Sequence, residues 1–286
     1  MNSSKLKWIL ILLFLAVNLF FLYEYETYSK VIECYTQEEI ANAVSVLKKH
    51  NTPVEISAVP ENKTTLPVLK LELNDTYREK AAKTLMSSSF AQFALPDGTG
   101  YSNDKETLTF FEGTSFRYSN SAFEDYNEDL LKNADGIEKP SHEKLLKALS
   151  EKLFSSSITT SRTFSLNLIS SRERDGFIYL KTRQTIDGTE IDTNLTEFVF
   201  KNENLVFARG NMFFLTDVSE FSADTLDVIN VLFKTEKDND TIVEINNLYF
   251  PVVTENNSFY LTPSYRFVHE SGKIQVRDAT SGIQRY

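Results

Sequence analysis

The sequence has little of the material from which metal and redox sites are built. It contains one cysteine, Cys34, and three histidines, His50, His142 and His269, among 286 residues. A single cysteine excludes an intrachain disulfide. None of the histidines has a second ligand-type residue at the spacing of a zinc site. We therefore expect no metal and no cofactor, and interpret Cys34, just before a helix start, as a boundary cysteine.

Motifs for catalysis are equally scarce. The chain has no glycine-rich phosphate loop, no G-x-S-x-G and no HExxH. Ser141-His142-Glu143-Lys144 matches the S-x-x-K pattern of penicillin-recognising enzymes, in which the lysine takes the proton of the serine. The companion S-D-N and K-T-G segments are absent, and Pro-Ser before a leucine stripe is typical of a helix start. Acidic pairs such as Glu38-Glu39 are interpreted as caps and turns rather than as the carboxylates of a glycosidase. The sequence therefore predicts a protein that is not an enzyme.

The charge balance excludes further classes of partner. The formal net charge is −10, from 30 basic and 40 acidic side chains. Such a chain is repelled by nucleic acid, by anionic lipid and by acidic wall polymers. We expect no nucleic-acid partner.

The long apolar run at the N-terminus predicts a membrane anchor over residues 8–23. Leu6–Tyr23 would form about 27 Å of helix, enough to span a bilayer with little tilt. No signal-peptidase site, with its two small residues separated by one position, follows the run, so we do not expect a cleaved signal peptide. Lys5 and Lys7 precede it, which places residues 1–7 in the cytoplasm and the bulk of the chain outside. The expected localisation is the cell membrane, with a single span in the lipid bilayer.

The anchor contains one amide, Asn18. On a helix it shares a face with five residues at the i±3, i±4 and i−7 positions: Ile11, Phe14, Leu15, Phe21 and Leu22. The span has no glycine for a close-approach contact, so the amide is the group able to bond a partner helix specifically. In the alternative interpretation, the bilayer simply tolerates this single asparagine and Asn18 binds no partner. The hypothesis is a partner-binding face centred on Asn18.

The remaining residues predict an α+β fold of antiparallel sheets, each packed with a helix. Expected helices follow Thr36, which would form a capping box with Glu39, cover 76–86, follow Pro140-Ser141, and run from Ser222 to Phe233, where Phe221 and Leu226 would form a hydrophobic staple. Turns are expected at Arg174-Asp175-Gly176 and Asp187-Gly188. Expected strands are 54–56, 66–73, 107–111, 115–118, 164–171, 177–184, 190–201, 205–214, 241–247, 258–261, 264–269 and 273–277. We expect a membrane-proximal domain at 24–138 and a C-terminal domain at 139–286. The latter contains a weak repeat of two helix-plus-strands units, 139–217 and 218–286.

Two segments resemble the YycH/YycI family, membrane-anchored regulators of a sensor histidine kinase in Gram-positive bacteria. At the N-terminus, KWILILLFLAVNLFFLYEY resembles the anchor of the family, and YTQEEIANAVSVLKKHN the helix that follows it. At the C-terminus, YLTPSYRFVHESGKIQVRDATSGIQRY is similar to its closing strands, with Tyr265 where the family often has tryptophan. A single span and 286 residues suit the shorter YycI type.

The resemblance implies a non-catalytic regulator that raises or lowers the activity of a histidine kinase in a cell-envelope two-component system. It would act through its transmembrane helix and outer domains, with the kinase and a sister regulator as partners. Two alternatives stay open: a membrane-tethered PepSY-like module that restrains a peptidase or wall hydrolase, and a wall-active enzyme with an unrecognised site.

The anchor interpretation predicts an uncleaved N-terminus. Mass spectrometry of membrane-extracted protein should find the Lys5–Tyr23 stretch joined to the rest of the chain, because no peptidase site follows the apolar run. A mature chain that begins between residues 24 and 35 would contradict the prediction.

Overall fold

The computed structural model describes residues 14–21, 34–63, 66–73, 75–111, 113–123, 126, 140–154, 162–214, 217–254 and 258–286. The chain divides into two compact units. Unit 1 takes its residues from 1–66, 225–246 and 265–286, and unit 2 from 67–224 and 247–264. This division differs from the contiguous domains expected at 24–138 and 139–286, because two long strands have residues in both units.

The expected anchor lies only partly within the described residues. Residues 14–21 are helical, while 8–13 and 22–23 lie outside the described part of the chain. Among the residues that are described, the structure contains no helix with the length and apolar character needed to cross a bilayer.

The first helix of unit 1, α2 (Gln37–Lys49), begins as its sequence predicts. The Thr36 hydroxyl accepts a hydrogen bond from the Glu39 N–H at 3.1 Å, and the Glu39 carboxylate accepts one from the Thr36 N–H at 2.6 Å. These two bonds form a capping box and satisfy donors that the first turn leaves without partners. They also hold the pKa of Glu39 below its usual value. The predicted helix start is therefore confirmed.

The second helix of unit 1, α5 (Val228–Phe233), begins later than expected. Its N-cap is Asp227, whose carboxylate accepts a hydrogen bond from the Asn230 N–H at 2.9 Å. The expected start at Ser222 is wrong, as is the staple built on Phe221, which belongs to strand β10 (Asp217–Phe221). The physical reason is that residues 222–225 contain no large apolar side chain to bury, so no amphipathic face forms before Val228.

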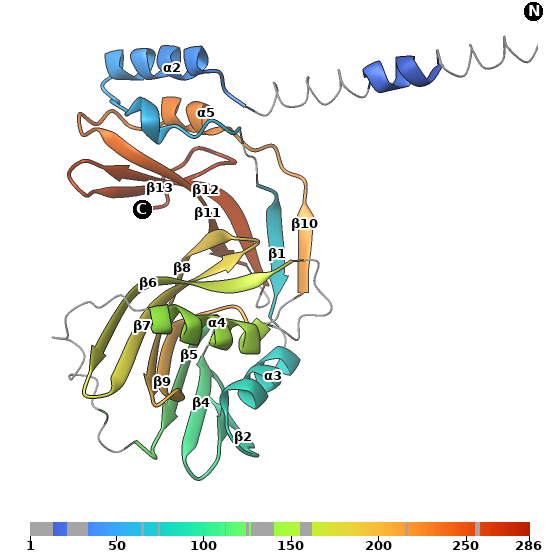
Figure 1. Cartoon of the computed structure of the whole chain (residues 1–286), viewed down its shortest axis with the longest axis vertical. Helices are drawn as coiled ribbons and strands as arrows, with labels where there is room; N and C mark the ends of the chain where they lie inside the picture. Colours follow the sequence, from blue (N-terminus) through green and yellow to red (C-terminus); the bar gives the residue numbers. More distant parts are fainter. Residues whose placement is uncertain are drawn as a thin grey trace, which may run out of the picture. The chain divides into compact units, whose positions relative to one another are not determined.

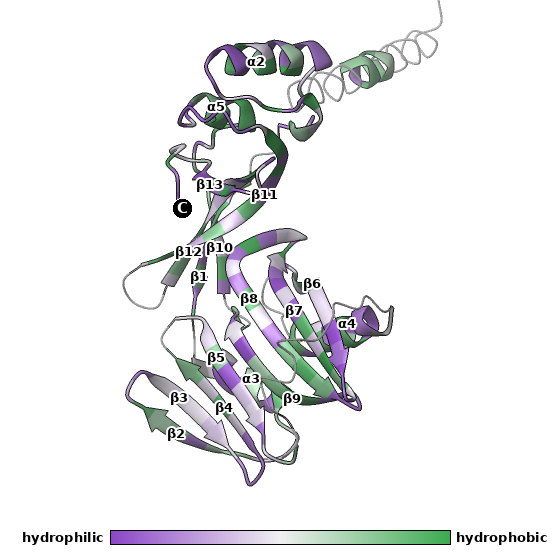
Figure 2. Cartoon of the chain, turned by 90° about the vertical axis from the view of Figure 1, so that its left-hand side faces the viewer, coloured by the Kyte–Doolittle hydropathy of each residue, from purple (hydrophilic) through white to green (hydrophobic). Residues whose placement is uncertain are grey.

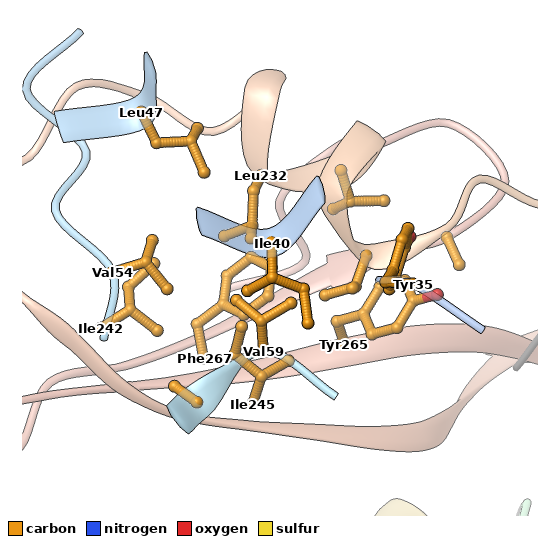
Figure 3. Close-up of a cluster of buried hydrophobic side chains, with 14 residues drawn as sticks. Tyr35, Ile40, Leu47, Val54, Val59, Leu232, Ile242, Ile245, Tyr265 and Phe267 are labelled. Atoms are coloured by element: carbon orange, nitrogen blue, oxygen red, sulfur yellow. The ribbon is translucent and has the colours of Figure 1, made fainter. Parts of the chain in front are cut away.

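The core of unit 1 collects side chains from segments far apart in the sequence (Figure 3). Ile40 and Leu47 of α2 lie in one buried cluster with Val231 and Leu232 of α5. The rest of the cluster includes Ile242 and Ile245 at the start of β11 (Ile242–Val253), Tyr265 and Phe267 of β12 (Ser258–His269), and Tyr35, Val54, Ala58, Val59, Val228 and Ala279. Strand β13 (Ile274–Asp278) pairs with β12.

One short strand expected in unit 1 is absent. Val54 forms an isolated parallel bridge with Ile242, and a 3-10 helix, η1 (Ile56–Ala58), follows. The strand expected at 54–56 is therefore wrong beyond that single bridge.

Unit 2 is built on a row of antiparallel strands (Figure 2). In spatial order they are β6 (Phe164–Arg174), β7 (Phe177–Ile186), β8 (Thr189–Lys201), β9 (Asn204–Asn211), β5 (Ser115–Asn120), β4 (Glu106–Phe111), β3 (Gly98–Ser102) and β2 (Ala91–Leu95). Asp187-Gly188 and Asp175-Gly176 have positive φ angles at both positions, as tight hairpin turns require. The turns expected at these positions are confirmed.

A second group of strands in unit 2 follows the order β10, β1 (Val68–Glu72), β12, β11. Leu248 and Tyr249 of β11 pair in parallel with Glu190 and Ile191 of β8. The mixed α+β class is confirmed, with this parallel pairing beside the antiparallel row of strands. Strands β2, β3 and β10 were not expected from the sequence.

Two helices, α3 (Asp75–Leu85) and α4 (Pro140–Phe154), belong to unit 2 (Figure 1). Helix α4 packs on β6 and β7 and contacts α3. Its buried side chains include Leu146, Leu149 and Leu153, the leucine stripe expected from the sequence. Along the chain, α4 precedes β6–β9 and α5 precedes β11–β13, so the order of a helix followed by strands occurs twice.

The cluster in unit 1 predicts unequal effects of two substitutions on α2. Ile40 is 1% exposed, and Ile40→Ala should lower the free energy of unfolding by about 2–5 kcal/mol, because it removes buried methyl groups and leaves a cavity. Val46 is 40% exposed on the same helix, and Val46→Ala should change it by no more than about 0.5 kcal/mol. Urea unfolding of the full chain in detergent, followed by circular dichroism, measures both. Equal losses would contradict the packing described here.

Candidate functional site

The expected partner-binding face is only partly within the described residues. Phe14, Leu15 and Phe21 are exposed by 71%, 55% and 64%, and Asn18 is also exposed. Ile11 and Leu22 lie outside the part of the chain that is described. The Asn18 side-chain N–H group donates to the Phe14 carbonyl one turn earlier, at 2.8 Å. An amide has two N–H donors and a carbonyl acceptor, so this bond uses only one of its hydrogen-bonding groups.

The residues considered for catalysis or metal binding are not brought together. His50 is the C-cap of α2, Cys34 donates to the Asn62 side chain at 3.3 Å, and the buried His269 lies 3.1 Å from the Asp240 carbonyl oxygen. Among the described residues there is no group of three or more metal-ligating side chains. Pro140 opens α4, so Ser141 lies inside the first turn rather than at the N-cap, and Lys144 is exposed.

One buried polar contact was missed by the sequence analysis. His142 is 0% exposed, with Nδ1 3.0 Å from Ser171 Oγ and Nε2 3.5 Å from a Glu173 carboxylate oxygen. A serine, an imidazole and a carboxylate in contact have the composition of a hydrolase triad. Ser171, however, is 2% exposed, and a nucleophile must be reached by its substrate. The contact therefore holds α4 on β6. Ser171 lies 29 residues beyond His142, and no motif links them.

A second buried polar group is the carboxylate of Glu106, the first residue of β4, which joins this strand to neighbouring segments of unit 2. Its carboxylate is 2% exposed and accepts hydrogen bonds from Ser87 N–H at 2.9 Å, Asn103 Nδ2 at 2.8 Å and Tyr118 OH at 2.8 Å. Burial raises the pKa of Glu106, but these hydrogen bonds lower it by more, so it lies below its ordinary value of 4.5. Burial and the neighbouring carboxylate raise the pKa of Tyr118, which stays protonated and donates.

A groove in unit 2 lies between α4 and β6. It has a volume of about 700 Å³. Its lining residues are Glu143, Leu146, Lys147, Ser150, Glu151 and Phe154 of α4, Thr163, Phe164, Ser165, Leu166, Asn167 and Leu168 at the start of β6, and Glu190. Glu190 receives a hydrogen bond from Arg183 at 2.5 Å. The groove thus has a helix on one side and a strand on the other.

Comparison with known proteins places the chain in no family. No family model matches it, and no curated protein matches it either. Several solved structures are similar, among them the following two. One is an uncharacterized protein from Eubacterium rectale, with 11% identity, a TM-score of 0.47, and coverage of 82% of this chain and 89% of the other. The second is the YpeB C-terminal domain of Bacillus megaterium, with 8% identity, a TM-score of 0.37, and coverage of 75% and 96%. Likeness at these TM-scores carries no argument about function.

The Glu106 contacts predict a specific dependence of stability on pH. Because the pKa of Glu106 is depressed in the folded state, its stabilisation is present above about pH 4.5 and is lost as the pH falls through the folded pKa. At pH 7, Glu106→Gln should lower the free energy of unfolding by about 1.5–3 kcal/mol, the value of hydrogen bonds to a charged group. The difference from the wild type should shrink on acidification to about pH 3, since the glutamine does not titrate.

Thermal unfolding between pH 7 and pH 3 tests this prediction. Glu151→Gln, which neutralises an exposed carboxylate on α4, is the control and should follow the wild type. A gap between Glu106→Gln and the wild type that stays constant over the whole range would contradict the role of the ionised carboxylate.

Proposed function

We propose that the chain is a non-catalytic, membrane-anchored regulator that modulates a sensor histidine kinase of a cell-envelope two-component system. The N-terminal apolar run acts as the transmembrane helix, and the residues of units 1 and 2 that follow it lie outside the cell. The helix contacts the kinase, a sister regulator, or both.

The observation that carries this proposal is the composition of unit 1. The two segments that resemble the kinase regulators stand at opposite ends of the chain, yet both contribute to one buried cluster. Ile40 and Leu47 come from the helix after the apolar run, and Tyr265 and Phe267 come from the closing strands. The Tyr265 hydroxyl donates to the Leu226 carbonyl at 3.2 Å, which fixes the closing strands against the segment before α5. The unit that follows the apolar run is therefore completed by the C-terminus.

Asn18 is the residue proposed to give the helix contact its specificity. Its bond to the Phe14 carbonyl holds the amide against its own helix, as polar side chains in helices commonly do. The amide oxygen and the second N–H group are then presented at a defined position along the helix. Hydrocarbon offers no competing water, so a partner helix with a polar group at that depth gains a hydrogen bond.

The test compares two substitutions in the apolar run. Asn18→Leu should weaken association with the kinase by about three- to twentyfold, because interhelical bonds of this kind contribute about 0.6–1.7 kcal/mol. Ala16→Leu changes a residue on the other side of the helix and should leave association unchanged. Crosslinking in the membrane, with the amounts of both variants matched, measures the association.

The identity of the captured protein separates this proposal from the alternatives. Capture of a histidine kinase or a second regulator supports it. Capture of a peptidase or a wall hydrolase in its place would favour a tethered restraining module. Equal association by Asn18→Leu and Ala16→Leu, at equal membrane levels, would remove Asn18 from the mechanism.

A further inference from the structure

Strand β6 stands at the end of its row of strands. Within the described part of the chain it pairs with β7 and with no other strand. The Thr163 carbonyl accepts a hydrogen bond from the Asp187 N–H at 2.8 Å, at the end of β7. In an antiparallel pair, backbone groups that bond the partner alternate with groups that point away from it. The backbone N–H and C=O groups of residues 163, 165 and 167 therefore point toward β7. Those of Phe164, Leu166 and Leu168 point away from it.

A direct contact confirms this alternation. The Leu166 N–H donates to the Ser150 hydroxyl of α4 at 3.2 Å, on the side away from β7. The outward edge of β6 therefore opens into the groove beside α4, with one of its donors held by a side chain. Phe164 and Leu168 lie on either side of this contact and direct their backbone groups to the same edge. An open strand edge is a template for the addition of another strand.

The walls of the groove define what an added strand would carry. Leu146, Phe164 and Leu166 supply apolar surface, which suits a strand with apolar side chains at alternate positions. Glu143 and Glu151 place two exposed carboxylates on α4, two turns apart, with Lys147 between them. The groove therefore favours a peptide that is neutral or basic, and the net charge of −10 for the chain points the same way.

We propose that this groove binds an extended peptide segment of a partner protein, which adds to β6 as a further strand. Its backbone bonds Phe164, Leu166 and Leu168, and its carbonyl takes the place of the Ser150 hydroxyl at the Leu166 N–H. Apolar side chains at alternate positions enter the groove, and a basic residue lies beside Glu143 or Glu151, on the side away from Lys147. The inference rests on unit 2 alone, so failure of the kinase test leaves it unaffected.

Binding can be measured with a defined probe. A fluorescein-labelled decapeptide in which valine alternates with lysine and threonine is titrated with the full chain in detergent at 0.15 M salt, and anisotropy is recorded. The control peptide has the same side chains but is N-methylated at its central residues, so it cannot form a strand. We expect binding of the first peptide only. Equal binding of both peptides would mean attraction by charge alone and would overturn the proposal.

Substitution of Leu168 tests the backbone contact. Leu168→Pro removes an outward N–H group without removing a bond to β7, and proline is tolerated at such edge positions. It should weaken peptide binding by about five- to tenfold, the effect of one or two lost hydrogen bonds. Leu168→Val keeps the N–H group and an apolar side chain, so it should bind as the wild type does. Equal binding by Leu168→Pro and Leu168→Val would overturn the proposal.

A second pair of variants keeps the test valid if Leu168→Pro does not fold. Glu143→Lys combined with Glu151→Lys should weaken binding of the basic peptide by about two- to tenfold, as expected for two exposed charges. Glu244→Lys makes the same kind of charge change at an exposed position of unit 1 and should have less effect. If Glu244→Lys weakened peptide binding as much per charge as the double variant does, the proposed site would be overturned.

Hydrogen exchange locates the added strand directly. Saturating peptide should slow exchange of the Phe164 and Leu168 amides, whereas Ser165 and Asn167, which already bond β7, should change little. Protection of Phe164 and Leu168 that is already complete without peptide would show that a second copy or another part of the chain occupies the edge. That result, or peptide protection at a different strand, would overturn the proposal.

Discussion

The hydrogen bond between His142 and Ser171 determines where α4 lies on the sheet of unit 2. Burial of its leucines favours contact with the sheet, but apolar burial has no direction and permits several positions along it. A buried imidazole must keep its hydrogen-bond partner, because leaving it unmade costs the full desolvation of the group. The His142–Ser171 contact at 3.0 Å and the Ser150–Leu166 contact at 3.2 Å therefore fix the helix at two points along β6. The Ser150–Leu166 bond lies in the wall of the groove and so contributes to its width.

Unit 1 depends on contacts between residues that are distant in the chain. Ile40, Ile242 and Phe267 share one cluster, so its core cannot be complete until the last strands have been synthesised. Contacts of such large sequence separation form slowly, because the closure of long loops precedes the stabilisation that they bring. Helix α2 thus gains part of its tertiary support from the C-terminal strands. A truncation there would remove Tyr265 and Phe267 and leave α2 without part of its core.

The sequence predicted best where the physical signal was local. The capping box at Thr36 and Glu39 and the Asp-Gly turns lie within four residues, and the structure has them where they were expected. The β2–β3 hairpin was missed, although Pro96-Asp97-Gly98 is a strong turn signal, because its strands contain few β-branched residues. The start of α5 was wrong because residues 222–225 contain no large apolar side chain to bury, so the helix begins only at Val228, after the Asp227 cap. The His142–Ser171 contact and the open edge of β6 follow from tertiary packing, which no local pattern encodes.

The two proposed contacts obey the same physical rule in different surroundings. An amide in hydrocarbon and a backbone edge beside an apolar groove are both polar groups placed where water competes weakly, so a bond to a partner is worth more there than on an open surface. In each case an internal acceptor already holds one donor: the Phe14 carbonyl for Asn18 and the Ser150 hydroxyl for Leu166. Such internal bonds remove the penalty of an unsatisfied donor when no partner is bound. They also reduce the net gain on binding, because at β6 one bond is exchanged for another. Affinity at the groove must then come chiefly from Phe164, Leu168 and the apolar walls, which is why Leu168 is the decisive position.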